Sequence, residues 1–515
     1  MPQPDARDAV VMEPPVKTVD PLTQAEQLLE RAAQLDPFQP QTEAQTQMAR
    51  ADQFDVDVTF IGAGPGGYVG AIRAAQLGGR VVCIEKEYLG GCCLNWGCIP
   101  TKSMIAAVER FHQVKHADAF GISTGEVGID FSKLMAHKDK VVSTLRNGIA
   151  SLFKKNGVRH VQGTGRIAGH HTVEVLLPDG STETIRTRTV VLATGSAPVK
   201  LPIPGLEGEG IWTSDDAVSA TAVPPRLLII GAGAIGCEFG YIYNGLGSKV
   251  TVVEIMPQIL PLEDADIAAE LQRSLTRQGI RFLLNSRVKE VQHGKNGVKQ
   301  VVVQTEKGDE SIECDVVLVA VGRKAVLDGL GLETVNVKTH EKGIAVNDKM
   351  ETSVPGIYAI GDVTGRIQLA HVASMEGIVA ASNAMGRERR MDYRAVPSCV
   401  YTVPEVASVG LTEKQAREKG YDVRVGKYAF RGLGKALAMN ERDGLAKVVS
   451  EARYGEILGV HIVGPHATDL IGEPVTAIQL ESTIEEMTHT IHAHPTLTEA
   501  LLEAFEDTER MAIHK

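Results

Sequence analysis

The sequence predicts an α/β protein with two Rossmann-like βαβ units followed by a C-terminal α+β domain. Two segments, 54–87 and 227–254, each read as strand, glycine-rich turn, helix and strand, and so form an internal duplication. After about residue 394 this pattern gives way to alternating strands such as LAKVVS and ILGVHIV, and then to helices. The length of 515 residues is enough for about three domains.

Composition excludes several classes of protein. Hydrophobic residues make up 43% and charged residues 23%, which is typical of a globular chain. Lys and Arg number 53 against 64 Asp and Glu, so the net charge of −11 argues against nucleic-acid binding. No apolar run is long enough to predict a membrane span, and the first residues do not resemble a secretory signal. Seven cysteines, an odd and sparse set, argue against a secreted disulfide framework and favour the cytoplasm.

Residues 1–53 differ from the rest and are expected to form a flexible arm with a short amphipathic helix at 22–35. Within 1–50, four basic residues face eight acidic ones, unlike an Arg-rich transit peptide. Two interpretations stay open: a solvated tail, or an arm that docks onto a partner complex.

The first glycine-rich turn, GAGPGG, has the spacing of a dinucleotide-binding site. Gly62 permits the tight turn, Gly64 lets a pyrophosphate approach the backbone, and Gly67 lets the helix pack closely on the strand. The start of the helix then faces the phosphates. Glu85, at the end of the following strand, is placed to accept hydrogen bonds from a ribose.

The second turn, GAGAIG, repeats this pattern with Gly231, Gly233 and Gly236. Glu254 follows at the end of the next strand, where a carboxylate accepts a free 2′-hydroxyl and repels a 2′-phosphate, so NAD is expected rather than NADP. Two dinucleotide sites in one chain imply two electron carriers, for which FAD and NAD are the expected pair.

Three cysteines, Cys92, Cys93 and Cys98, lie between these two sites. Zinc is disfavoured because the sequence has no second CxxC pair, and no metal is expected. A redox disulfide suits the neighbouring sites better. Adjacent Cys92 and Cys93 would bridge only with strain, whereas Cys93 and Cys98 would lie roughly 7.5 Å apart along an ideal helix. A bridge between the latter two therefore requires a distorted helix start, where a thiolate is favoured.

The segment GGCCLNWGCIPTK, residues 90–102, resembles the redox-active signature of the class I FAD-dependent pyridine nucleotide–disulfide oxidoreductases. The resemblance extends over about residues 54–515. It implies that Cys93 is the interchange thiol that meets substrate and that Cys98 lies against the flavin. Lys102 is then the lysine near the flavin, paired with Glu238. The family usually has Thr where this chain has Cys92, which is expected to be a packed small residue.

The resemblance also implies roles for more distant residues. Thr194 and Gly195, in ATGSAP, would close part of the FAD site, and Asp362, in GIYAIGDV, would bind the ribityl and phosphate region. Gly322, followed by Arg323, matches a motif on the NAD side, although Ala325 and Val326 replace the Pro-Asn that often follows. HPTLTE matches the family's catalytic pair, with His494 as the base and Glu499 orienting it, whereas His492 is expected to have no special role.

The domain boundaries expected from the resemblance are an arm at 1–53, an FAD-binding domain at 54–199, an NAD-binding domain at 200–325, a second FAD-binding and central part at 326–393, and an interface domain for dimerisation at 394–515. The implied enzyme is a homodimer that reoxidises dihydrolipoamide on the lipoyl domains of a 2-oxoacid dehydrogenase or glycine-cleavage complex, with NAD⁺ as hydride acceptor. Two alternatives stay open: a glutathione-type reductase, or a complex subunit whose tethering arm matters as much as its catalysis.

Overall fold

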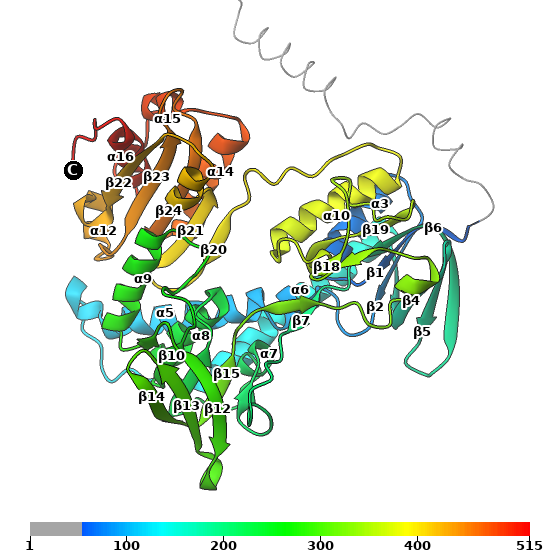
Figure 1. The fold of residues 1–515 in the computed structure, drawn as a ribbon, viewed down its shortest axis with the longest axis horizontal. Helices are drawn as coiled ribbons and strands as arrows, with labels where there is room; N and C mark the ends of the chain where they lie inside the picture. Colours follow the sequence, from blue (N-terminus) through cyan, green and yellow to red (C-terminus); the bar gives the residue numbers. More distant parts are fainter. Residues whose placement is uncertain (1–53) are drawn as a thin grey trace, which may run out of the picture. The chain divides into compact units, whose positions relative to one another are not determined.

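The computed structural model describes residues 54–515, so the arm and helix expected within 1–53 lie outside the described residues. The first βαβ unit lies in a sheet of order β3-β2-β1-β6-β5-β4, in which β19 also pairs with β6 (Figure 1). The pairs β3-β2, β2-β1, β1-β6 and β6-β19 are parallel, whereas β4, β5 and β6 form an antiparallel meander. The strands of this sheet are β1 (Val56–Ile61), β2 (Val81–Glu85), β3 (Arg159–Gln162), β4 (Thr164–Gly169), β5 (Thr172–Leu176), β6 (Thr182–Leu192) and β19 (Ile357–Ala359).

Helix packing on the first sheet depends on glycine. Strands β1 and β2 are buried along their whole length, as expected for parallel strands that are covered on both faces. Helix α3 (Pro65–Gln76) joins them and packs against α10 (Ala370–Ala384). A Cβ atom added at Gly377 would lie 2.3 Å from the carbonyl oxygen of Gly66, so the two backbones touch only because neither residue has a side chain.

The second βαβ unit forms a parallel sheet of its own, in the order β11-β10-β9-β15-β8. Helix α8 (Ala234–Gly245) joins β9 to β10, and α9 (Ala265–Arg277) leads from β10 to β11. An antiparallel sheet, β12-β13-β14, shares a hydrophobic core with it. The strands are β8 (Ile211–Trp212), β9 (Arg226–Ile230), β10 (Lys249–Val253), β11 (Arg281–Leu283), β12 (Arg287–His293), β13 (Lys299–Thr305), β14 (Gly308–Cys314) and β15 (Val316–Val319).

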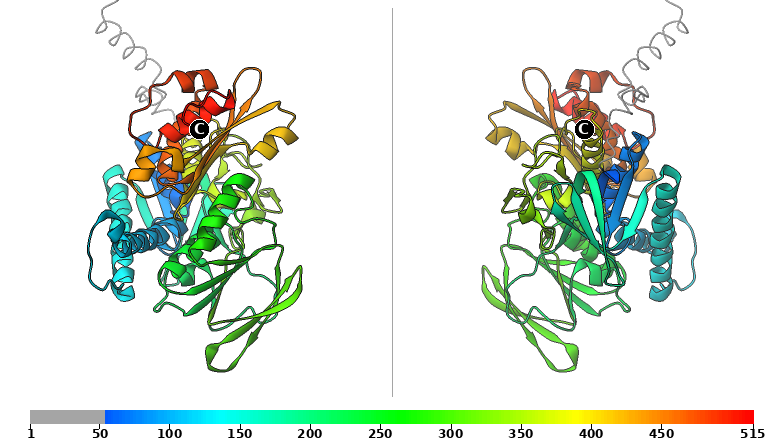
Figure 2. Two further views of the ribbon diagram at one scale, coloured as in Figure 1. Left: turned by 90° about the vertical axis from the view of Figure 1, so that its left-hand side faces the viewer. Right: turned by 90° about the vertical axis from the view of Figure 1, so that its right-hand side faces the viewer.

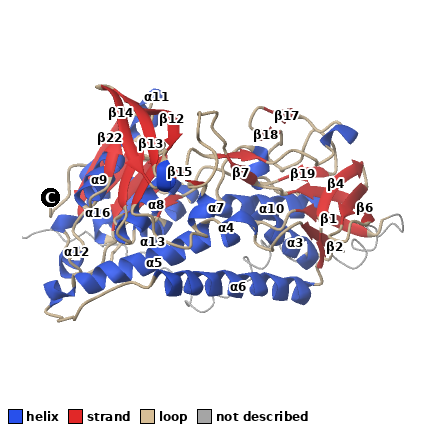
Figure 3. Ribbon diagram, turned by 90° about the horizontal axis from the view of Figure 1, so that it is seen from below, coloured by secondary structure: helices blue, strands red, loops and turns tan. Residues whose placement is uncertain are grey.

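Two long helices connect the two units. Helices α5 (Cys98–Lys115) and α6 (Phe131–Asn156) run alongside each other beneath the sheets (Figure 3). Leu134, near the start of α6, belongs to the hydrophobic core of the second unit, whereas Ile149 and Phe153, near its end, belong to the core of the first. Helix α6 therefore contributes to both cores.

The C-terminal part is an antiparallel sheet of order β20-β21-β24-β23-β22, flanked by short helices (Figure 2). Lys447 on β23 is 2% exposed and binds Asp264 at 2.8 Å, which ties this sheet to the N-terminal cap of α9. The strands are β20 (Ser398–Val400), β21 (Glu405–Gly410), β22 (Val423–Ala429), β23 (Leu445–Glu451) and β24 (Ile457–Gly464). The helices are α11 (Glu413–Glu418), α12 (Gly434–Ala438), α13 (Ala467–Leu470), α14 (Gly472–Gln479), α15 (Ile484–His489) and α16 (Glu499–Thr508).

Shorter elements connect these parts. Strands β7 (Ser196–Pro198) and β16 (Arg323–Ala325) pair where the chain passes into and out of the second unit. The other short elements are α4 (Gly91–Asn95), α7 (Ser214–Ala217), β17 (Thr339–His340), β18 (Gly343–Ile344), η1 (Ala117–Phe120), η2 (Lys295–Gly297), η3 (Leu332–Thr334), η4 (Gly361–Thr364) and η5 (Phe430–Gly432).

The expected fold class, two Rossmann-like units and an α+β domain, is confirmed. The boundaries expected at 53, 199, 325 and 393 stay a prediction. Within residues 54–515, no helix is both long and apolar enough to cross a membrane.

Candidate active site

The two glycine-rich turns have nearly the same backbone geometry. Gly62 has a φ of +105° and Gly231 a φ of +101°, a region that side chains rarely adopt. A Cβ atom at Gly67 would lie 1.9 Å from the oxygen of Gly62, and one at Gly236 would lie 1.9 Å from the oxygen of Gly231. Each third glycine therefore lets its helix start pack against the preceding turn.

The second glycine of each turn is loosely surrounded, since a Cβ atom at Gly64 would come no nearer than 3.9 Å to another residue, at the Cα of Gly91. Gly64 and Gly233 are the N-cap residues of α3 and α8, and neither helix has a side-chain cap. The backbone amides that follow Pro65 in α3, and those of the first turn of α8, are thus available to phosphate oxygens. A Cβ atom at Gly233 would meet no atom within 4 Å, which leaves room for a ligand at the turn.

A buried carboxylate stands beside each turn in the same arrangement. Glu85 accepts hydrogen bonds from the backbone amides of Ala63 and Glu87, both at 2.9 Å. Glu254 accepts from Ala232 at 2.7 Å and from Met256 at 2.9 Å. Two orientated carboxylates beside uncapped helix starts fit the ribose and pyrophosphate of two dinucleotides.

One cavity of about 1850 Å³ extends between the two turns. Most of the predicted site residues line it: Gly62, Gly64, Glu85, Cys93, Cys98, Lys102, Thr194, Gly195, Gly231, Gly233, Glu238, Glu254, Gly322 and Asp362. Gly67 and Gly236 pack behind the turns instead. His494 and Glu499 do not line this cavity.

The thiol pair lies in the middle of the cavity wall. Cys93 is in α4 and Cys98 is the first residue of α5, and the helix is broken between them at Trp96 and Gly97. A Cβ atom at Gly97 would lie 3.3 Å from the Cα of Cys93, so the absence of a side chain eases this tight turn. The distortion that the spacing required is present. Both cysteines are free thiols in this structure.

The two sulfurs are hydrogen-bonded to each other, and this hydrogen bond shifts the pKa values of the two thiols in opposite directions. The hydrogen bond from Cys93 lowers the pKa of Cys98 to about 7, and the charge of Lys102 acts in the same direction against the effect of burial. The same hydrogen bond, together with burial, holds the pKa of Cys93 far above its usual value. The geometry therefore favours a thiolate at Cys98 and a thiol at Cys93.

Lys102 is held by a buried carboxylate. Its Nζ atom lies 2.9 and 2.8 Å from the two oxygens of Glu238, and 4.3 Å from the centre of the Tyr401 ring. The backbone amide of Tyr401 donates to Glu238 as well, at 3.0 Å. This ion pair, expected from the resemblance, is present.

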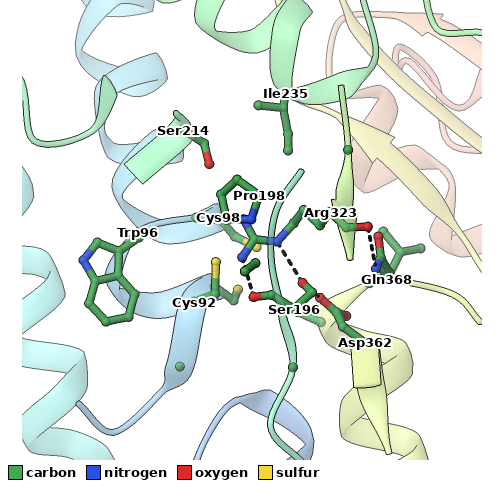
Figure 4. Close-up of a pocket in the computed structure, with 18 of the residues that line it drawn as sticks. Cys92, Trp96, Cys98, Ser196, Pro198, Ser214, Ile235, Arg323, Asp362 and Gln368 are labelled. Atoms are coloured by element: carbon green, nitrogen blue, oxygen red, sulfur yellow. Dashed lines mark hydrogen bonds between the residues drawn. The ribbon is translucent and has the colours of Figure 1, made fainter. Parts of the chain in front are cut away.

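Asp362 belongs to a chain of hydrogen bonds with Ser196 on β7 and Arg323 on β16, the two strands that pair between the units (Figure 4). The Ser196 hydroxyl donates to Asp362 at 2.5 Å, and Arg323 donates to that hydroxyl and to the Ser196 carbonyl oxygen, both at 2.8 Å. Thr194 donates to the carbonyl oxygen of Val326 at 3.0 Å. These contacts fix the positions of Thr194, Ser196 and Asp362, which line the cavity.

The support beneath Asp362 could not be predicted from the sequence. Glu376 on α10 is fully buried and accepts a hydrogen bond from the Gly361 amide at 2.6 Å and from the Tyr393 hydroxyl at 2.7 Å. Burial raises the pKa of Glu376 in spite of these bonds. A helical Glu followed 17 residues later by a Tyr has no local signature, because the contact depends on the folded arrangement.

Cys92 also lines the cavity, in the neighbourhood of Arg323 (Figure 4). Burial raises the pKa of its thiol to about 11, although the positive charge of Arg323 opposes the shift. At neutral pH Cys92 is therefore a protonated and unreactive thiol.

His494 and Glu499 form the expected pair at a different place. The Nδ1 atom of His494 lies 2.8 Å from Oε1 of Glu499, and the Thr496 amide donates to the other oxygen at 2.9 Å. Burial alone would raise the pKa of Glu499, but these hydrogen bonds hold it below its usual value. The His494 side chain is 79% exposed, so its Nε2 is open to an incoming group.

Within residues 54–515, no three His, Cys, Asp or Glu side chains gather in the geometry of a metal site. Two dinucleotide cradles that meet at a thiol pair define the class of protein: an oxidoreductase that passes electrons between a dithiol and nucleotide carriers. The pyridine nucleotide-disulphide oxidoreductase family matches residues 56–377, and the dimerisation domain of that family matches residues 396–505. The chain belongs to this family, whose cofactors, FAD and NAD, fit the two cradles.

Similar proteins of known name narrow the class. The dihydrolipoyl dehydrogenase of Thermus scotoductus is 44% identical over 462 residues, which cover 89% of this chain and 98% of that protein. The mitochondrial dihydrolipoyl dehydrogenase of Pisum sativum is 42% identical over 462 residues, or 89% of this chain and 92% of that protein. The crystal structure of LpdA from Mycobacterium tuberculosis has a TM-score of 0.81 at 29% identity, covering 87% of this chain and 98% of that chain.

Proposed function

We propose that this protein oxidises dihydrolipoamide with NAD⁺ through Cys93 and Cys98. The observation that carries the proposal is the hydrogen-bonded sulfur pair in the wall of a cavity that reaches both dinucleotide cradles. The similarity to dihydrolipoyl dehydrogenases supports the choice of substrate. The carboxylate of Glu254 supports NAD⁺ rather than NADP⁺, because it would repel a 2′-phosphate.

The thiol steps use the residues of this chain. In the oxidised enzyme Cys93 and Cys98 form a disulfide. His494 accepts a proton from one substrate thiol, and the resulting thiolate attacks the Cys93 sulfur, which releases Cys98 as a thiolate. The second substrate sulfur then attacks the mixed disulfide, oxidised lipoamide leaves, and the enzyme keeps two electrons as a dithiol. FAD, which Gly62, Gly64 and Glu85 would hold, would supply the transfer of this electron pair to NAD⁺.

The electrostatics support these roles. The Cys98 thiolate, stabilised by Cys93 and by the charge of Lys102, is a good leaving group and the electron-rich sulfur of the reduced pair. Glu499 holds Nδ1 of His494, which leaves Nε2 to take the substrate proton.

His494 does not line the cavity of its own chain, so we propose that a second copy supplies it. The match to a dimerisation domain over residues 396–505, which include His494, supports a homodimer in which each base serves the thiols of the other subunit. The proposed substrate is dihydrolipoamide carried on a lipoyl domain of a multienzyme complex, and the proposed location is the cytoplasm.

A spectrum of the purified protein tests the proposal. We expect flavin absorbance and, on addition of dihydrolipoamide, a long-wavelength charge-transfer band from the Cys98 thiolate. Cys93→Ser should abolish turnover of dihydrolipoamide, and NADPH should replace NADH poorly in the reverse reaction. A colourless protein, or full turnover by the Cys93→Ser variant, would overturn the assignment, and reduction of glutathione disulfide instead of lipoamide would change the substrate.

A further inference from the structure

A second histidine–glutamate pair lies beside the first. His492 is two residues before His494 on the loop between α15 and α16, and its side chain is only 5% exposed. Its Nδ1 atom lies 2.9 Å from the carbonyl oxygen of Thr490, and its Nε2 atom lies 2.8 Å from Oε1 of Glu473. The local sequence predicts no special role for this histidine, whose contact with Glu473 forms only in the folded chain.

The partners of His492 determine its charge. A carbonyl oxygen and a carboxylate oxygen only accept hydrogen bonds, so both ring nitrogens must donate, and only the doubly protonated imidazolium can do so. The hydrogen bond to Glu473 raises the pKa of His492, although burial opposes it. Two carboxylates of α16, those of Glu499 and Glu506, are also close enough to interact with this charge.

Glu473 connects this cation to the wall of the cavity. It is the second residue of α14, and Gly472, the residue before it, lines the cavity of the same chain. His492 therefore joins the base-bearing loop to a rigid element of the site. Among residues 54–515, the only side-chain hydrogen-bond partner of the neighbouring His494 is Glu499, at the start of the next helix, so His494 has no such anchor of its own there.

We propose that Glu473 and His492 are positioning residues for His494: their ion pair fixes the loop that presents the base. The inference rests on the proposed function, in which His494 receives the substrate proton. A misplacement of about 1 Å can cost about 100-fold in rate, so a base on an otherwise exposed loop needs a support of this kind. His494 of one subunit would serve the thiols of the partner subunit. The pair of His492 and Glu473 therefore also connects the base of one active site to the cavity wall of the second active site.

The test compares Glu473→Gln and His492→Gln with His514→Gln, in the full-length holoenzyme. His514 forms the same type of pair with Glu503, at 2.6 Å, but lies near the C-terminus with its side chain 72% exposed. We expect the first two variants to lower kcat for dihydrolipoamide oxidation at least about tenfold. They should leave KM for NAD⁺ and the rate of ferricyanide reduction by NADH within about twofold, because these steps need no thiol base. His514→Gln should lower kcat by less than about twofold, although the charge of His514 also acts on Glu499.

The pH profile separates positioning from simple support of the fold. Loss of the proton from His492 should lower kcat at alkaline pH, and because a neutral amide holds that proton less tightly, this decline should begin at lower pH in Glu473→Gln. A parallel loss of flavin, thermal stability and both activities would mean that the pair is merely structural, and would overturn the proposal. If His494→Gln abolished turnover while both test variants kept the original kcat, the inference would fail and the proposed function would stand. If the unmodified enzyme did not oxidise dihydrolipoamide, the proposed function itself would fail.

Discussion

Both carboxylate oxygens of Glu238 bind the ammonium group of Lys102, at 2.9 and 2.8 Å. The two charges nevertheless act in opposite directions on Cys98, since Lys102 lowers the pKa of that thiol and Glu238 raises it. We therefore expect Lys102→Met to raise the pKa of Cys98 and Glu238→Gln to lower it. A pH titration of thiolate absorbance in the reduced holoenzyme measures both, and shifts of the same sign would contradict this account of the site.

The loss of turnover at low pH should follow the protonation of the Cys98 thiolate. With a pKa of about 7, the thiolate is nearly complete above about pH 8 and falls tenfold per pH unit below about pH 6. Turnover of dihydrolipoamide measured from pH 5 to 9 should therefore decline on the acid side; a rate that stayed constant down to pH 5 would contradict this.

A subunit that lacks the base and a subunit that lacks the reactive thiol should together restore one active site in a mixed dimer. His494→Gln alone is expected to lower kcat by about 100- to 10,000-fold, the usual contribution of a general base. Coexpression of His494→Gln with Cys93→Ser should form mixed dimers that have one complete site. If half of the dimers are mixed, the mixture recovers about a quarter of the original activity. No recovery in verified mixed dimers would place both groups in one subunit.

Substitution of the third glycine of a turn, Gly67 or Gly236, should impair only the nucleotide site at that turn. A Cβ atom at position 67 or 236 would lie 1.9 Å from a backbone oxygen, so alanine must displace the turn. Gly67→Ala should be purified with little flavin. Gly236→Ala should keep its flavin and still show the long-wavelength band on addition of dihydrolipoamide, while turnover with NAD⁺ falls at least about 100-fold. The flavin content and the two half-reactions, measured separately, decide the point.

Cys92 should be dispensable. Because burial raises its pKa to about 11, Cys92→Thr should change kcat by less than about twofold, and Cys92 should react with an alkylating agent at pH 7 much more slowly than Cys98. Peptide mapping of the alkylated, reduced protein measures the order of reaction. Loss of turnover in Cys92→Thr with normal flavin content would give this thiol a redox role.

The parts of the site that could be predicted from sequence are those set by local backbone. Gly62 and Gly231 carry a turn that requires a positive φ, and such a turn has a signature within six residues. The cysteine segment is equally local: the five-residue spacing of Cys93 and Cys98 already required a broken helix start. The fold class followed from the same two turns, because each specifies a parallel βαβ unit.

The remaining parts depend on contacts that the chain makes only when folded. Ser196 meets Asp362 across 166 residues, and Glu376 supports Gly361 from a helix with no distinctive pattern. His492 shows the limit most clearly. Its neighbour His494 stands in a recognisable motif, but the charge of His492 is determined by Glu473 and by a carbonyl oxygen, and neither is visible in the local sequence.

Helix α6 has a consequence for how the molecule responds to heat. Because Leu134 is packed in the core of one nucleotide unit and Phe153 in that of the other, neither core can melt without uncovering part of the same helix. The two nucleotide units should consequently denature in one cooperative transition. A substitution that leaves a cavity at either end of α6 should lower the melting temperature of both units.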